Sequence, residues 1–248
     1  MIAAARLATV IEATWPPLHR HRLGPWTIRD GAGGGKRVSA ASAETLVSEA
    51  DLPQAEAAMR ALGQPPLFLI RLWDSGLDAM LAARDYQKID PVLAYAAPVD
   101  RFGPPPTMTS FPHWPPMAIA RSLWEEAGIG PARLAVMDRA KGPKTAVIAR
   151  ARDRAAGVAF VALDGDIAML HGLEITPDQR RQGCAAIILR AAAAWARDQG
   201  ATVLCLVVTE ANAAARALYV SAGMEVVGRY HYRQEPPPKA ANPCPPNS

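Results

Sequence analysis

The stretch Leu170-His-Gly-Leu-Glu-Ile-Thr-Pro-Asp-Gln-Arg-Arg-Gln-Gly-Cys-Ala185 decides the fold of this chain. An apolar run over 167–175 predicts a strand, a Pro-Asp turn follows it, and an alanine-rich helix begins directly after Gly183. The first amides of a helix have no partner within the helix and carry the positive end of its dipole, so they bind anions. Gly183 has no side chain to keep a phosphate away. The sequence therefore predicts a phosphate-binding turn between a strand and a helix.

Composition limits the kinds of protein that this chain can be. The 248 residues are 50% apolar and 20% charged, with a formal net charge of +4, which fits a globular protein of one large or two small domains. There is no Lys- or Arg-rich tract, so we expect no nucleic-acid partner, and the mild basicity suits an anionic small molecule. There is no apolar run of about 20 residues and no signal-like start, so we expect no membrane partner and a cytoplasmic location.

The three cysteines, Cys184, Cys205 and Cys244, have no regular spacing. An odd, irregular set predicts neither a disulfide framework nor a metal site, so no metal is expected. Cys205 lies in an apolar run that predicts a core position, and the start of a helix at Cys184 favours a lowered thiol pKa there.

Predicted elements fall into two parts on either side of a proline-rich segment at 98–116. The first part reads as helices at 1–14, 51–62 and 77–84 and strands at 26–30, 38–42, 67–72 and 92–96. The second part reads as helices at 117–127, 184–199 and 211–222 and strands at 145–151, 157–163, 167–175, 202–208 and 225–233. Residues 134–138 read as a strand or a short helix. The composition of 236–248 predicts a disordered tail.

The second part resembles the GNAT superfamily of acetyl-CoA-dependent N-acetyltransferases. Arg180, Gly183 and Ala185 match that family's phosphate-turn signature, and the stretch 209–224, with its Asn, Leu-Tyr pair and Gly-Met ending, matches a second motif one helix and one strand later. The resemblance covers about residues 117–233. It implies an α/β (α+β) fold, with a mixed, mostly antiparallel sheet flanked by helices.

The first part resembles a degenerate copy of the same fold, because its strand, helix and strand over 67–96 repeat the order seen over 202–233. No Arg-x-x-Gly-x-Ala element appears between residues 40 and 67. We therefore expect two related domains with one working site: a GNAT-like N-terminal domain at 1–105, an acetyl-CoA-binding catalytic domain at 106–235 and a tail at 236–248.

The resemblance implies roles for residues of the second part. The turn would bind the pyrophosphate of acetyl-CoA through main-chain amides, and the end of the strand at 173–175 would pair with the pantetheine arm where that strand splays from its neighbour. Asn212, Arg216 and Tyr219 lie at i, i+4 and i+7 and share one helix face. Asn212 is either a cofactor contact or a helix cap, and Tyr219 would protonate the departing thiolate. The predicted cofactor-binding residues are Leu173, Ile175, Arg180, Arg181, Gln182, Gly183, Cys184, Ala185, Asn212 and Arg216.

The reaction also needs a base for the amine proton, and the sequence offers His171 and Glu174. In a regular strand these two side chains point to opposite faces, so at most one would face the acceptor. Some members of the family place a carboxylate earlier on this strand, where this chain has Met169. A buried, hydrogen-bonded histidine and a solvent-facing Glu174 are the alternatives.

The glycine cluster at 31–37 does not form a nucleotide-binding loop. The NTPase motif needs Gly where this chain has Asp30, and Ser or Thr where it has Arg37. We read it as a mobile loop placed to cover an acceptor site.

The sequence thus predicts an acetyl-CoA-dependent N-acetyltransferase that acts by direct attack of a primary amine in a ternary complex. The alternatives are an acyl-CoA-binding sensor without turnover and a nucleotide-dependent enzyme. The acceptor would be a small-molecule or peptide amine, and a homodimer is left open.

Overall fold

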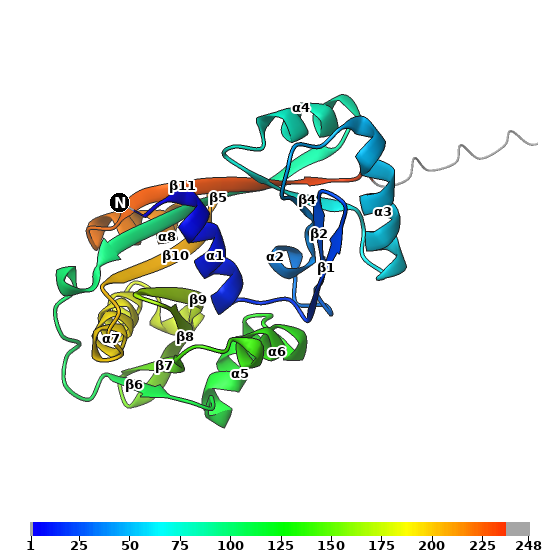
Figure 1. Ribbon diagram of the computed structural model, residues 1–248. Helices are drawn as coiled ribbons and strands as arrows, with labels where there is room; N and C mark the ends of the chain where they lie inside the picture. Colours follow the sequence, from blue (N-terminus) through cyan, green and yellow to red (C-terminus); the bar gives the residue numbers. More distant parts are fainter. Residues whose placement is uncertain (1, 237–248) are drawn as a thin grey trace, which may run out of the picture.

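A computed structural model describes residues 2–236 of the chain (Figure 1). The predicted disordered tail lies outside the described residues from residue 237 onward. Within 2–236 no helix has both the length and the apolar composition needed to cross a membrane.

One eight-stranded sheet organises the molecule, in the order β4-β11-β5-β10-β9-β8-β7-β6. The neighbours pair antiparallel except for β9 and β10, which run parallel. This mixed, mostly antiparallel sheet confirms the predicted fold class. Its strands are β4 (Leu67–Arg71), β5 (Gln87–Pro98), β6 (Ser110–His113), β7 (Lys144–Ala151), β8 (Arg154–Asp164), β9 (Ile167–Ile175), β10 (Val203–Thr209) and β11 (Glu225–Gln234).

Helices cover both faces of this sheet (Figure 1). Strand β8 shows the reason, because its alternate side chains enter different hydrophobic cores. Val161 packs in the core under α7 (Cys184–Asp198) and α8 (Ala213–Ser221). Phe160 packs in the core under α5 (Ala118–Glu126) and α6 (Pro131–Arg139). Helix α1 (Ala4–Thr14) lies on the α5 side, against β8 and β9. Burial on both faces explains the long apolar runs of the central strands.

The N-terminal part adds a second, small sheet of β1 (His19–Leu23), β2 (Trp26–Asp30) and β3 (Ser42–Ala43). A parallel bridge between Ala41 and Phe68 joins it to β4. Helices α2 (Lys36–Ser39), α3 (Leu52–Ala61) and α4 (Ser75–Ala83) complete this part, and three 3-10 turns lie at Glu49–Asp51, Val99–Arg101 and Pro177–Gln179.

Three local predictions differ from the structure. Of the predicted strand at 38–42, residues 38–39 belong to helix α2 and only Ser42 belongs to a strand, β3. Residues 134–138, read as a strand or a short helix, lie in helix α6. Strand β1 was not predicted, because its exposed sequence His-Arg-His-Arg-Leu has no alternation of apolar and polar residues. Strand β6 includes Pro112, which an edge strand tolerates because one side of its backbone needs no partner.

The two predicted parts interlock within the large sheet. Strand β5 lies between β10 and β11, and β11 lies between β4 and β5. The two strand-helix-strand units, β4-α4-β5 and β10-α8-β11, therefore interleave: β11 of the second unit lies between the two strands of the first, and β5 of the first lies between the two strands of the second. The structure shows both units in one continuous sheet, while their descent from a common domain stays a prediction.

Candidate active site

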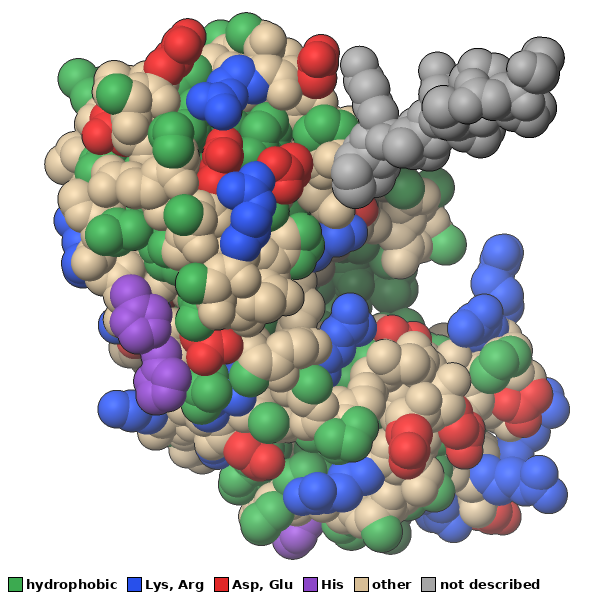
Figure 2. All heavy atoms as spheres, turned by 90° about the vertical axis from the view of Figure 1, so that its right-hand side faces the viewer, with side chains coloured by type: hydrophobic (Ala, Val, Ile, Leu, Met, Phe, Trp, Pro, Cys, Tyr) green, Lys and Arg blue, Asp and Glu red, His purple; other side chains and the backbone are tan. Residues whose placement is uncertain are grey.

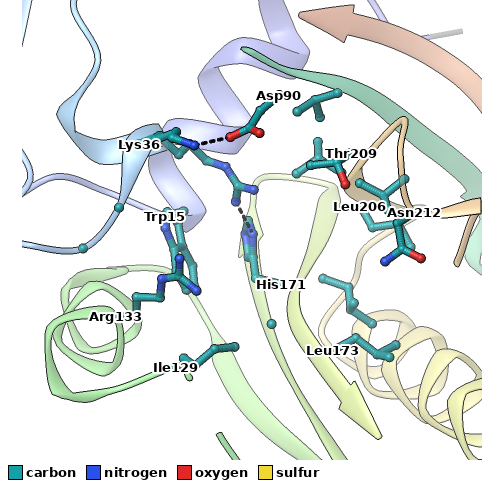
Figure 3. A pocket seen from close by; sticks show the side chains of 18 of the residues that line it. Trp15, Lys36, Asp90, Ile129, Arg133, His171, Leu173, Leu206, Thr209 and Asn212 are labelled. Carbon is teal, nitrogen blue, oxygen red and sulfur yellow. Dashed lines mark hydrogen bonds and ion pairs between the residues drawn. The ribbon is translucent and has the colours of Figure 1, made fainter. Parts of the chain in front are cut away.

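Strands β9 and β10 separate halfway along their length. They pair from Ile167 with Val203 to Leu170 with Leu206, and beyond these residues neither strand has a register partner in the other. Strand β9 nevertheless continues to Ile175 and β10 to Thr209. A cavity of about 660 Å³ occupies the opening, and its walls include Leu173, Leu206 and Thr209 (Figure 3). This divergence agrees with the splayed strand expected from the resemblance.

A β-bulge shapes the part of β9 that faces the cavity. The pairing with β8 shifts between Phe160–His171 and Val158–Glu174, so that β9 carries one residue more than β8 there. Gly172 takes φ +54°, a left-handed conformation that glycine adopts without strain, and its carbonyl accepts a hydrogen bond of 2.8 Å from Trp124 Nε1. Because of the extra residue, His171 and Glu174 both line the cavity. The prediction that at most one of them would face it is wrong.

His171 is buried, with both ring nitrogens engaged. Arg37 Nη1 can only donate, so the 3.1 Å contact to Nδ1 makes Nδ1 the acceptor. Nε2 then carries the proton and donates to Thr14 Oγ1 at 2.9 Å, and Thr14 donates to the Val10 carbonyl. Burial, and secondly the Arg37 charge, hold the pKa of His171 well below its usual value. The ring is therefore a neutral partner of Arg37 whose one acceptor is occupied, which disfavours it as a base.

Glu174 and Tyr219 lie on the same cavity. Burial raises the pKa of the half-buried Glu174 carboxyl, with Arg180 and Arg133 acting in the opposite direction. Burial, then the Glu174 charge and the Tyr95 neighbour, raise the pKa of Tyr219 to about 12. The Tyr219 side chain is only 6% exposed and its ring lies 5.6 Å from that of Tyr95. Near neutral pH this phenol keeps its proton.

The predicted phosphate turn leads directly into helix α7. Arg181 and Gly183 both have positive φ, at +62° and +80°, and Gly183 is the helix N-cap without any side-chain capping bond. A Cβ atom placed on Gly183 would meet no other atom within 4 Å. The first amides of α7 thus face open space beside exposed Arg180 and Arg181, a geometry that fits a pyrophosphate. Residues 181–185 lie outside the cavity wall itself.

Two predicted residues of this turn, Arg180 and Gln182, also donate hydrogen bonds to the local backbone. Arg180 Nε donates to the Ile175 carbonyl at 3.3 Å, and Gln182 Nε2 donates to the Asp178 carbonyl at 2.8 Å. Burial raises the pKa of the Cys184 thiol, so the expectation of a lowered pKa at this helix start is wrong. Cys205 is fully buried, as predicted.

Of the residues of the second motif, Asn212 lines the cavity and Arg216 does not. Asn212 caps α8, accepting a hydrogen bond of 3.1 Å from the Ala215 amide, and it also lines the cavity. The two readings of Asn212 therefore do not exclude each other. Arg216 lies outside the cavity wall and donates to the Glu210 carbonyl at 3.0 Å. Leu173 and Ile175 pack partly against the core below α7.

The cavity also has a wall that the motifs did not reveal. Trp15, Lys36, Arg37 and Asp90 come from the N-terminal part, and Lys36 is ion-paired with Asp90 (Figure 3). The glycine cluster supplies Gly34 and Gly35, so the loop expected near an acceptor site does line the cavity. Figure 2 shows the molecule hollowed between two bodies, with basic side chains at the margins of the hollow. In the sequence, the glycine cluster is the feature that indicates a part of this wall.

The described residues, 2–236, contain no group of three His, Cys, Asp or Glu side chains arranged to hold a metal ion.

Comparisons with known proteins agree on one family. Residues 114–224 match the model of the acetyltransferase (GNAT) family. An uncharacterized N-acetyltransferase of Bacillus subtilis (strain 168), YobR, is 23% identical over 239 residues, which cover 92% of this chain and 97% of that protein.

Two solved structures show the same fold over most of the chain. A GCN5-related N-acetyltransferase from Kribbella flavida superposes with a TM-score of 0.73 at 19% identity, covering 96% of this chain and 97% of that one. A tandem GNAT protein from the clavulanic acid biosynthesis pathway gives 0.59 at 16% identity, covering 93% and 88%. Together with the split strands and the turn before α7, these matches show that residues 114–224 form an acetyltransferase domain of the GNAT family.

Proposed function

We propose that this acetyltransferase uses acetyl-CoA as donor and transfers the acetyl group to a primary amine by direct attack in a ternary complex. The observation that carries the proposal is the opening between β9 and β10, which the unpaired end of β9 and Tyr219 line and which the turn before α7 follows directly in the chain. Acetyl-CoA supplies the activated acetyl carbon and a thiolate leaving group.

In this proposal the turn and strand hold the donor. The amides at Arg181–Ala185 bind the pyrophosphate, with charge added by Arg180 and Arg181. Backbone groups of Leu173–Ile175, which have no partner on β10, pair with the pantetheine arm. The Gly172 bulge turns the backbone at Leu173 into the opening, where an amide stabilises the negative charge that develops on the carbonyl oxygen. Asn212 lines the same opening from the start of α8.

Proton transfers fall to Glu174 and Tyr219. The amine nitrogen forms a bond to the acetyl carbon, the carbon–sulfur bond breaks, and the proton released from nitrogen passes to Glu174, directly or through water. Tyr219 donates its proton to the departing sulfur. The raised pKa of Glu174 makes its carboxylate a stronger base than an exposed one, while Tyr219 stays protonated as an acid must.

Tyr219→Phe tests the acid. We expect kcat to fall at least about 100-fold, a common effect of losing a general acid, while the affinity for coenzyme A measured by calorimetry stays within twofold. The substrates are acetyl-CoA and a panel of amino acids, polyamines, aminoglycosides and peptides, with thiol release as the readout. Tyr95→Phe is the matched control, because it removes a hydroxyl from the neighbouring ring, which does not line the cavity.

Two results would contradict the proposal. An unchanged rate for Tyr219→Phe across the pH range would remove Tyr219 as the acid. Coenzyme A binding without acetyl transfer to any amine would favour a sensor that holds acyl-CoA without turnover.

A further inference from the structure

Two polar atoms on the cavity wall lack the partners that buried polar atoms normally have. Among residues 2–236, four buried side-chain nitrogen or oxygen atoms have no hydrogen-bond partner, and two of these are Arg37 Nε and the Tyr230 hydroxyl. Both residues line the cavity between β9 and β10, on the side formed by the N-terminal part. Leaving such groups unpaired costs free energy, so their position inside a cavity points to a ligand that pairs with them.

The Arg37 charge has no carboxylate partner, although the phenols of Tyr230 and Tyr232 beside it offset its burial and raise its pKa. Within the described chain Arg37 forms no ion pair with an acidic side chain. Of the two acids that line the cavity, Asp90 is paired with Lys36, and Glu174 experiences the charges of Arg180 and Arg133. A cation held away from water without a counter-charge is costly. The cavity wall thus carries two cations without an ion pair, the exposed Arg133 and Arg37, and of these Arg37 has the buried, unpartnered nitrogen.

The guanidinium is held in a fixed orientation. Nη1 donates to His171 Nδ1 at 3.1 Å, the contact that Figure 3 draws as a dashed line to His171, and the group lies 5.8 Å from the centre of the Trp15 ring. His171 is itself fixed by Thr14. On the other edge, Nε has no hydrogen-bond partner among residues 2–236, and the phenols of Tyr230 and Tyr232 lie beside the group. Such an edge is a planar two-donor fork that matches a carboxylate.

We propose that Arg37 binds the carboxylate of the acceptor, so that the acceptor is an amino acid or another small amine that carries a carboxylate. This inference rests on the proposed function, since it names the substrate class of the same site. Glu174 lines the same cavity as Arg37, so an acceptor anchored at Arg37 shares that space with the proposed base. One guanidinium balances the single charge of a carboxylate. Of the other cations on the wall, Lys36 is paired with Asp90, and Arg133 is exposed and acts on Glu174.

The test compares amino acids with their α-carboxamides, which have nearly the same size and lack the charge. With acetyl-CoA as donor and thiol release as readout, we expect wild-type kcat/KM to be at least about 10-fold higher for the carboxylates, because hydrogen bonds to charged groups are worth about 1.5–3 kcal/mol. Arg37→Gln should bring this ratio to about one. Arg37→Lys keeps the charge but not the fork, so its ratio should lie between the two. Arg190→Gln, on the exposed face of α7, should keep the wild-type ratio.

A second arm needs no turnover. In the presence of coenzyme A, amino acids should raise the unfolding temperature of the wild type more than their carboxamides do, and this difference should disappear in Arg37→Gln.

Several outcomes would overturn the inference: equal use of carboxamides by the wild type, a preference that survives in Arg37→Gln, or a stronger preference for amines that carry a phosphate. If Arg37→Gln does not fold, Arg37 is structural and the inference fails, unless Arg37→Lys folds and lowers the ratio. Turnover of amines without a carboxylate preference would refute this inference alone. Absence of turnover, with carboxylate-dependent stabilisation still present, would refute the proposed function alone.

Discussion

At the scale of single residues, Glu174 and Tyr219 show how one cavity sets two acid–base groups apart. Burial is the first cause of the raised pKa of each group. For a carboxyl, a raised pKa favours the neutral acid and gives a better proton acceptor once ionised. For a phenol it secures the proton up to high pH. Because the ordinary pKa values of the two groups are 4.5 and 10.0, the same burial strengthens Glu174 as a base and keeps Tyr219 protonated as an acid near neutral pH.

Glu174 should therefore cost stability at neutral pH. A carboxyl whose pKa is raised on folding contributes stability fully below its unfolded pKa, near 4.5, and loses it as pH rises through the folded pKa. We expect Glu174→Gln, which does not titrate, to be more stable than the wild type from pH 7 to 8 and to lose this advantage below pH 4.5.

Urea unfolding midpoints between pH 4 and 8 measure this difference. Glu225→Gln, on the exposed start of β11, serves as control and should show a small offset without the same pH dependence. A Glu174→Gln variant less stable than the wild type at pH 7 would mean that Glu174 is held in a net favourable pair with Arg133 or Arg180.

At the scale of elements, the sequence predicted a helix or strand correctly where all the residues that determine it lie close together in the chain. Strand β9 spans the predicted 167–175 and α7 begins at Cys184, because apolar alternation, the Pro-Asp turn and the positive-φ Gly183 all act within a few residues. The bulge at Gly172 was not predictable, since a single glycine in a strand does not specify a left-handed conformation. Two other features could not be predicted: the place of β5 between β10 and β11, and the contact between Arg37 and His171. Each joins residues more than 100 positions apart in the chain, so no local sequence pattern signals it.

The start of α7 carries a prediction with a matched control in the same helix. Gly183 and Gly200 flank α7, at φ +80° and +87°, and a Cβ at either would meet no atom within 4 Å. Replacing either by Ala should cost about 1–2 kcal/mol of unfolding free energy through backbone strain. Only Gly183→Ala places a methyl group in front of the helix amides, so it alone should weaken coenzyme A binding, by at least about 10-fold.

Calorimetric titration with coenzyme A and with pantetheine distinguishes the cause. The effect of Gly183→Ala should be large for coenzyme A and small for pantetheine, which lacks the pyrophosphate. Equal weakening by Gly183→Ala and Gly200→Ala would show that α7 does not bind the phosphates.

At the scale of the whole molecule, the site exists only because the two predicted domains share a sheet. Tyr219 and Glu174 come from the C-terminal part, while Trp15 and Arg37 come from the N-terminal part. Strands β10 and β11 do not pair with each other, and each pairs with β5 from the first part. The predicted boundary at residue 105 therefore separates sequence motifs more clearly than it separates folding units.

A fragment of residues 106–236 should accordingly fail to fold by itself. Without β5, strand β10 exposes one full edge and β11 loses both neighbours, which leaves their backbone groups unpaired and invites aggregation. We expect this fragment to show no cooperative unfolding and no heat with coenzyme A, whereas the full chain unfolds in one transition. Production together with a fragment of residues 2–105 should restore both properties. As a control, protease cleavage within the exposed proline-rich segment at 103–108 should leave the two pieces associated and active, because no strand is cut. A 106–236 fragment that folds cooperatively and binds coenzyme A would show that the second part is an independent domain and that β5 can be replaced by pairing within it.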